Sequence, residues 1–270
     1  MTRTKTLGFI GAGNMAEAIA RAAIGQGVVA PADLIAADVS EARREVFRQM
    51  GVAVAEDATQ VALAAQQIML AIKPQQAADV ARAIAPQLAD DHVIISIMAG
   101  ISTAKLAELL DAPAPRVIRV MPNTPLMVGL GMTGVALGPH ARPGDETLTM
   151  SLFSCGKSEA ILVSEDKIDA ITAVSGSGPA YLFYLAEAMQ QAAEQLGLGE
   201  RKELLVNQTL IGAATLLLNS PDPAGELRRK VTSPGGTTQA AIECMETKHV
   251  RPAIVEALAA AQRRSKELGK

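Results

Sequence analysis

The residues with the clearest chemical potential form a glycine-rich loop near the start of the chain. Its sequence is Gly11-Ala12-Gly13-Asn14-Met15-Ala16, and it directly follows the apolar run Leu7–Ile10. Gly11 permits a tight turn, Gly13 lets phosphates approach the backbone, and Ala16 lets a helix pack closely on the strand. A helix beginning here would direct amide hydrogens and its positive dipole end at an anion. Because a purely structural turn does not need this placement between strand and helix, we predict a dinucleotide-binding site.

An acidic residue lies where such a site contacts the adenosine ribose. Asp38 follows the apolar run Leu34–Ala37, about 20 residues after the loop, where a carboxylate accepts from the 2′-hydroxyl of NAD. However, Arg43 and Arg44 follow closely and could bind the 2′-phosphate of NADP. The two arginines could equally form the solvated face of a helix. The choice between NADPH and NADH therefore stays open.

A third segment, Ala71-Ile72-Lys73-Pro74, ends another apolar run at Ile68–Ile72. The carboxyl edge of a parallel sheet is where ligands bind in such folds, so we expect this segment to lie against the cofactor. Pro74 would stiffen the loop. Lys73 alone could also be an ordinary surface residue.

Two segments rich in Gly, Ser and Pro occur later in the chain, at Val174–Tyr181 and Val231–Thr238. Both run into a predicted helix, and capping hydroxyls at helix starts explain part of their composition. Capping does not explain two glycines followed by two threonines at 235–238. Exposed amides and hydroxyls there would form a small-anion site at a helix N-terminus, suited to a substrate carboxylate.

The elements that must position these residues form an alternating pattern. Short apolar runs at 7–10, 34–37, 68–72, 93–97 and 117–121 alternate with helical patterns at 13–25, 40–50, 75–88 and 102–110. Such alternation predicts βαβ units around a parallel sheet covered on both faces. Two further strands at 132–137 and 159–163, around a helix at 145–154, extend this sheet. We therefore predict an α/β fold with an N-terminal dinucleotide-binding domain at 1–164.

The remainder, 165–270, is predicted to be all-α. Ser177-Gly178-Pro179 has the residue types of a helix start. Glu203–Asn219 is apolar on nearly every face, which indicates burial all round. Because so small a domain cannot easily cover such a helix, we expect it to form a subunit interface as well as a core element. A last helix is expected near 250–268.

Bulk composition excludes several classes of protein. Hydrophobic residues make up 49% and charged residues 20% of the chain, which suits a globular protein. The net charge of −3 gives no reason to expect nucleic acid or an anionic membrane as a partner. Cys155 and Cys244 match no metal or redox spacing, no apolar run reaches the roughly 18 residues of a membrane span, and no secretory signal is evident. We expect a cytoplasmic protein without a metal site.

Five motifs together resemble the pyrroline-5-carboxylate reductase family. They are G-A-G-N-M at 11–15, A-I-K-P at 71–74, R-V-M-P-N-T-P at 119–125, V-S-G-S-G-P-A-Y at 174–181 and V-T-S-P-G-G-T-T at 231–238. The resemblance implies an N-terminal Rossmann-type domain, an all-α dimerisation domain, and reduction of a cyclic imine to L-proline with NADPH or NADH. It also implies a homodimer that shares active sites and can assemble into a decamer.

The resemblance also assigns roles to residues. It places the substrate carboxylate on the amides of Gly236, Thr237 and Thr238, within a substrate site that includes Ser177 and Gly235. It places the Thr238 hydroxyl, the catalytic candidate, near the ring nitrogen. Asn123 and Thr124 would line the nicotinamide side, and Met98 and Ala99 would join the cofactor contacts.

Two other classes of function fit the sequence less well. A β-hydroxyacid dehydrogenase would need a catalytic lysine on the helix near 167–184, but Lys167 precedes that helix and Ser, Gly, Pro and Ala follow Gly176. A non-catalytic dinucleotide sensor would not need the Gly-Gly-Thr-Thr run. Imine reduction requires no covalent nucleophile, and neither of the two later segments contains Cys, His or Lys.

Overall fold

The computed structural model describes residues 3–269, which divide into two compact units. A sheet unit extends to Ser177 and also includes the residues from Ala261 onward, and a helical unit covers Gly178–Ala260. The α/β class and the succession of a Rossmann-type sheet domain and a helical region are confirmed. The sequence places the boundary at 164/165, whereas the contacts place residues 165–177 with the sheet.

A buried charge cluster accounts for that placement. The guanidinium of Arg119 is 3.5 Å from the carboxylates of both Glu165 and Asp169, and Arg119 is only 6% exposed. Ser265 also donates to Asp169, at 2.7 Å. Buried charges must stay paired, so this cluster fixes residues 165–169 and the end of the last helix to the sheet unit.

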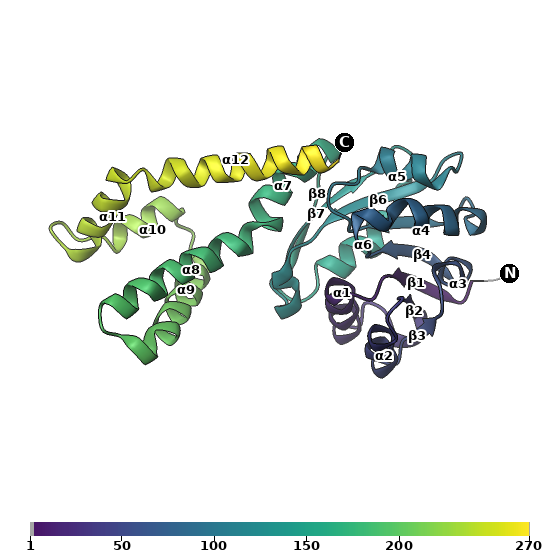
Figure 1. Cartoon of the computed structure of the whole chain (residues 1–270), viewed down its shortest axis with the longest axis horizontal. Helices are drawn as coiled ribbons and strands as arrows, with labels where there is room; N and C mark the ends of the chain where they lie inside the picture. The colour runs from purple at the N-terminus through teal and green to yellow at the C-terminus, as the bar shows by residue number, and fades with distance from the viewer. Residues whose placement is uncertain (1–2, 270) are drawn as a thin grey trace. The chain divides into compact units, whose positions relative to one another are not determined.

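The sheet unit contains one eight-stranded sheet in the order β3-β2-β1-β4-β5-β6-β7-β8 (Figure 1). Neighbouring strands are parallel except β6 and β7, which are antiparallel. The strands are β1 Lys5–Ile10, β2 Leu34–Ala37, β3 Ala53–Ala55, β4 Ala65–Leu70, β5 Val93–Ser96, β6 Arg116–Met121, β7 Met132–Leu137 and β8 Glu159–Leu162. The helices of this unit are α1 Asn14–Gly25, α2 Glu41–Gln49, α3 Ala58–Ala64, α4 Ala77–Ile84, α5 Thr103–Leu110, α6 Glu146–Phe153 and α7 Ile168–Ile171.

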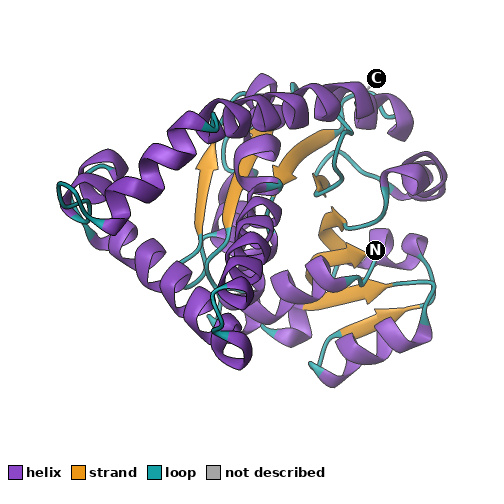
Figure 2. Ribbon diagram, turned by 60° about the vertical axis from the view of Figure 1, so that its left-hand side comes forward, coloured by secondary structure: helices purple, strands orange, loops and turns teal. Residues whose placement is uncertain are grey.

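Helices cover both faces of this sheet, as the alternating pattern predicts (Figure 2). Leu7 and Phe9 of β1 face one core cluster, which includes residues of α1, α2 and α6. Ile10 faces the other cluster, which includes residues of α3, α4 and α5. The alternation follows from the two-residue period of a strand. The first cluster contains the ring pair Phe9–Phe47, with centroids 5.7 Å apart.

The structure corrects the sequence prediction at several elements. Strand β3 and helix α3 were not predicted, because the alanine-rich stretch around them shows little periodicity. Strand β4 ends at Leu70, so Ile72 lies in the loop that follows and not in the strand. The chain reverses between β6 and β7 because their connection is too short for a parallel crossover, which requires a dozen or more residues.

The helical unit contains α8 Gly178–Gln195, α9 Lys202–Asn219, α10 Ala224–Lys230 and α11 Thr237–Thr247, with most of α12 Val250–Leu268. The predicted helix start at Ser177-Gly178-Pro179 is confirmed, because α8 begins at Gly178. What the sequence did not predict is that α7 and a π-helical turn, Thr172–Gly176, come directly before it. Helix α9 buries Val206 alone, so its apolar surface is largely exposed in the single chain.

Candidate functional site

The glycine-rich loop lies where the order of strands reverses, between β1 and β4. Two backbone bonds fix it: Gly11 donates to Ala37 and Ala71 donates to Ile10, both at 2.8 Å. Gly11 has a φ of +94°, and a Cβ there would lie 2.5 Å from the Ala71 carbonyl oxygen. Both conditions require glycine. Gly11 therefore shapes the loop itself.

Gly13 meets a different condition. A Cβ at this position would have no heavy atom within 4 Å, so the protein itself does not require glycine there. Gly13 is also the N-cap of α1, and Asn14 and Met15 are its first two residues, whose N–H groups have no partner within the helix. An open backbone face beside unpaired amides at a helix N-terminus fits a pyrophosphate.

A groove of about 650 Å³ opens beside this loop. It brings together six of the residues predicted to bind the cofactor: Gly11, Gly13, Asp38, Ala71, Ile72 and Lys73. Sequence reasoning missed other lining residues, which include Val39, Glu56, Asp57, Thr59 and Gln76. Three of them lie at the start of α3, and Asp57 caps that helix by accepting from Gln60 at 2.9 Å. An Asp at a helix start was the signal that could have located them.

The charged groups at the Asp38 end of the groove already form hydrogen bonds within the protein. Asp38 accepts from the N–H groups of Ala12, at 2.7 Å, and Ser40, at 2.8 Å. Arg43 donates to the Ala12 carbonyl at 2.6 Å and to Glu17 at 2.7 Å. Arg44 donates to Glu41 at 2.8 Å and to the carbonyl of Asp38. The two arginines thus brace the loop and the end of β2, rather than forming a merely solvated helix face.

Other predicted cofactor residues do not line this groove with their side chains. Met98 is 2% exposed and belongs to the apolar core, and Ala12 is fully buried. Ala99 is exposed beyond β5, and Pro74 begins the short turn that leads into α4. At these positions only the backbone or a fixed loop shape can serve a cofactor.

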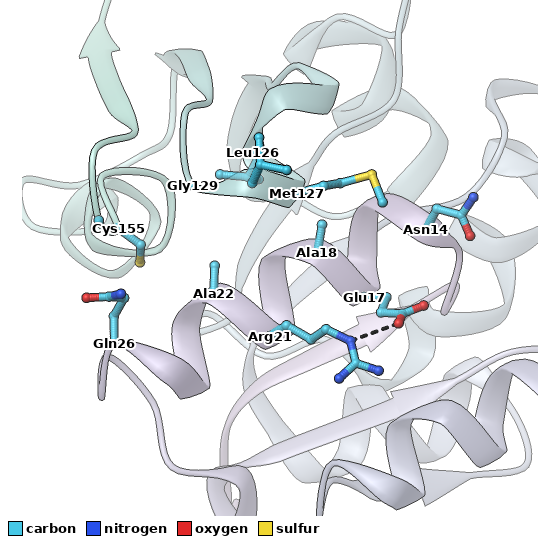
Figure 3. A pocket seen from close by; sticks show the side chains of 12 residues that line it. Asn14, Glu17, Ala18, Arg21, Ala22, Gln26, Leu126, Met127, Gly129 and Cys155 are labelled. Carbon is cyan, nitrogen blue, oxygen red and sulfur yellow. Dashed lines mark hydrogen bonds and ion pairs between the residues drawn. The ribbon is translucent and has the colours of Figure 1, made fainter. Parts of the chain in front are cut away.

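The Asn14 side chain faces a second hollow, of about 390 Å³, between α1 and the turn Thr124–Val128 (Figure 3). Helix α1 forms one wall of this hollow, and on it Arg21 forms an ion pair with Glu17 at 2.8 Å. From the opposite wall, the Met127 side chain extends toward Asn14. Cys155 lines its far end, and burial raises the pKa of this thiol. A thiol with a raised pKa is a poor nucleophile.

Asn123 lies at the end of β6 and is 8% exposed. Its side-chain amide donates to the Ser175 carbonyl at 3.1 Å, and its side-chain oxygen accepts from the Met132 N–H at 2.9 Å. Both polar atoms of this predicted cofactor residue therefore bind the protein.

The Gly-Gly-Thr-Thr segment of the helical unit forms a turn followed by a helix N-terminus. Gly235 has a φ of +70°, and Gly236 is the N-cap of α11. The Gly236 N–H donates to Ser233 at 3.0 Å, and the Gly235 N–H donates to Gln239 at 2.7 Å. Thr237 and Thr238 are the first two helical residues, whose N–H groups have no intrahelical acceptor. These two amides can receive an anion.

The comparisons with known proteins cover both units. Residues 165–268 match the family model described as pyrroline-5-carboxylate reductase dimerisation, and residues 6–100 match the NADP oxidoreductase, coenzyme F420-dependent model. Pyrroline-5-carboxylate reductases of Pseudomonas aeruginosa and Pisum sativum are each 40% identical to the chain. The alignments cover 98% and 97% of this chain, and 97% and 96% of the relatives.

Solved structures agree. A pyrroline-5-carboxylate reductase from Coxiella burnetii has a TM-score of 0.90 and 39% identity, covering 99% of this chain and 100% of that one. The Plasmodium falciparum pyrroline carboxylate reductase, solved with NADP bound, has a TM-score of 0.88 and 27% identity over the full length of both chains. With these relatives and an open glycine loop for a dinucleotide, the chain is an NAD(P)H-dependent oxidoreductase and belongs to the pyrroline-5-carboxylate reductase family.

Proposed function

We propose that this chain reduces 1-pyrroline-5-carboxylate to L-proline, the last step of proline biosynthesis, and that its substrate binds at the start of α11. The main support is the pair of backbone amides at Thr237 and Thr238, in the first turn of α11. The amides of Gly235 and Gly236, just before them, already donate within the preceding turn. A carboxylate accepts from two such amides and gains further from the positive end of the helix dipole.

The reaction adds a hydride to the imine carbon and a proton to the imine nitrogen. The bound dinucleotide supplies the hydride. The chain must hold the substrate carboxylate, orient the ring, and donate a hydrogen bond to the nitrogen as it becomes more basic. We assign the carboxylate to the amides of Thr237 and Thr238, and the hydrogen bond to the Thr238 hydroxyl.

The groove beside β1 and β4 is proposed to bind NADPH or NADH. Gly13 and the first amides of α1 would receive the pyrophosphate, and Asp38 would lie at the ribose. Ala71, Ile72, Lys73 and Pro74 would form the opposite wall. Gly235, Gly236 and Ser177 would complete the substrate site by shaping the backbone and adding a hydroxyl.

An activity assay tests this function. The purified chain should oxidise NADPH or NADH at 340 nm only when pyrroline-5-carboxylate is present, with L-proline as product. A saturated analogue without the C=N bond is the control and should give no turnover. Absence of L-proline with both cofactors would rule out the assigned substrate.

We further propose that the helical unit forms a homodimer with shared active sites, and that dimers assemble into a decamer in the cytoplasm. Large apolar side chains are exposed along this unit, with Phe183 at 64%, Tyr184 at 76% and Leu218 at 72%. A surface of this kind is normally covered by another chain. Among residues 3–269, none of the helices is both long and apolar enough to cross a membrane.

A further inference from the structure

The carbonyl of Ser175 has no ordinary helical donor. In an α-helix a carbonyl accepts from the N–H four residues later, which for Ser175 belongs to Pro179. Proline has no N–H, so that bond cannot form. The backbone widens at this point into the π-helical turn Thr172–Gly176, where the Ser177 N–H donates to Thr172 at 2.8 Å.

Asn123 donates to this carbonyl from outside the helix. Its amide nitrogen is 3.1 Å from the Ser175 oxygen, in a side chain that is 8% exposed. Its oxygen is held by the Met132 N–H at 2.9 Å, which fixes the orientation of the amide. A partly buried bond of this kind is costly to remove, because the carbonyl loses a donor that Pro179 cannot supply.

The neighbouring residues show that the two segments fit closely. A Cβ at Gly176 would lie 2.5 Å from the Met121 Cε, so the π-helical turn packs directly against the side chain at the end of β6. Asn123 then lies within bonding distance of Ser175. The motif at 119–125 and the motif at 174–181 are thus two halves of one contact.

We propose that Asn123 is a positioning residue that holds the π-helical turn, and with it the direction of Ser177, rather than a direct contact of the cofactor. The proposal rests on the proposed function, in which Ser177 belongs to the substrate site. Loss of the Asn123 side-chain amide would therefore lower kcat/KM for the pyrroline and leave the affinity for the dinucleotide unchanged.

A double-mutant cycle with Asn123→Ala and Pro179→Ala tests this role. Asn123→Ala should lower kcat/KM for the pyrroline by about ten- to hundredfold, mainly through KM, and change the Kd for NADPH by less than about twofold. Pro179→Ala restores an N–H to the Ser175 carbonyl, so Asn123→Ala should cost much less in that background. Independent, additive effects would show that the Ser175 carbonyl is not the link.

A second measurement does not depend on turnover. Hydrogen exchange of the peptide covering 172–180 should speed up in Asn123→Ala and slow again in the double variant. A loss of NADPH affinity as large as the loss of kcat/KM, or unchanged exchange, would overturn the positioning role. If the wild-type chain did not reduce the pyrroline, the proposed function would fail, and the exchange data would still decide whether Asn123 fixes the turn.

Discussion

The carboxylate of Asp38 accepts the backbone N–H of Ala12 at 2.7 Å and thereby ties the end of β2 to the glycine-rich loop. Its other oxygen accepts from Ser40. The carboxylate therefore helps to shape the loop and also places a negative charge in the groove, at the end proposed to bind the ribose. These two roles can be separated by substitution.

Asp38→Asn should shift cofactor preference toward NADPH. The substitution removes the charge that would repel a 2′-phosphate, while one amide bond to the loop can remain. We expect the ratio of Kd values, NADPH over NADH, to fall by roughly tenfold, which corresponds to about 1.4 kcal/mol. Fluorescence titration with both dinucleotides measures it. An unchanged ratio would mean that Asp38 acts on the loop alone.

Gly13→Val should abolish dinucleotide binding without unfolding the protein. A Cβ there meets no protein atom within 4 Å, so only a bound pyrophosphate would collide with it. Gly11→Ala is the contrasting variant, because it combines a φ of +94° with a close approach to Ala71. Gly11→Ala should lower both the affinity for the dinucleotide and the melting temperature. NADPH affinity and melting curves of both variants check this, and unchanged affinity in Gly13→Val would mean that the cofactor site is misplaced.

Thr238→Ala should slow turnover while carboxylate binding survives. The amide remains, but the hydroxyl proposed for the imine nitrogen is lost, at a cost of about 1–3 kcal/mol or roughly ten- to hundredfold in kcat. The alternative role, helix capping, is less suited to this residue, because the N-cap of α11 is Gly236. Thr238→Ser keeps the hydroxyl and is the control. Normal kcat with reduced thermal stability in Thr238→Ala would exclude the catalytic role.

The ion pair between Arg116 and Asp145 should make stability depend on acid pH. Asp145 is 4% exposed; burial alone would raise its pKa, but the Arg116 guanidinium and the Arg142 N–H together hold the pKa below its usual value. Since the folded pKa is the lower one, the pair stabilises the fold above the unfolded pKa of about 4 and loses this effect as pH falls through the folded value.

Asp145→Asn should therefore destabilise the protein by about 3 kcal/mol at pH 7, because it leaves the largely buried Arg116 guanidinium without a charged partner. The difference from wild type should shrink toward pH 3. Glu108→Gln breaks the exposed pair with Lys105 and should change the melting temperature little at either pH. A pH-independent difference for Asp145→Asn would argue against the lowered pKa.

The assembly should not dissociate to a stable monomer. Helix α9 buries only Val206 within one chain, so much of its apolar surface requires a partner. Light scattering at micromolar concentration should give a dimer or a multiple of it, up to a decamer. Leu218→Glu, on the exposed face of α9, should weaken the assembly. A folded, stable wild-type monomer would contradict both the proposed interface and the proposed shared active site.

The sequence alone was sufficient for features that depend on local pattern. A strand followed by Gly11 and Gly13 and then a helix predicts the dinucleotide loop, because the strand, the turn and the helix start are adjacent in sequence. Alternating apolar runs likewise predicted strands β1, β2, β5 and β6, and the added strands β7 and β8. An all-α region after the sheet was also evident, because the short apolar runs end there and apolar residues then recur at helical spacing.

Contacts between distant segments could be read only from the tertiary structure. Strand β3 and helix α3 have an alanine-rich sequence with weak periodicity. Their form depends on tertiary contacts, because β3 pairs with β2 and α3 packs on β1. The run at 174–181 has the composition of a helix start, and α8 begins in it at Gly178, but its first residues belong to a π-helical turn that the sequence did not predict. The Ser175 carbonyl, to which Pro179 cannot donate, accepts from Asn123, 52 residues away in sequence. Local propensity contains no information about such a partner, because a hydrogen bond across the fold depends on where the sheet places its donor.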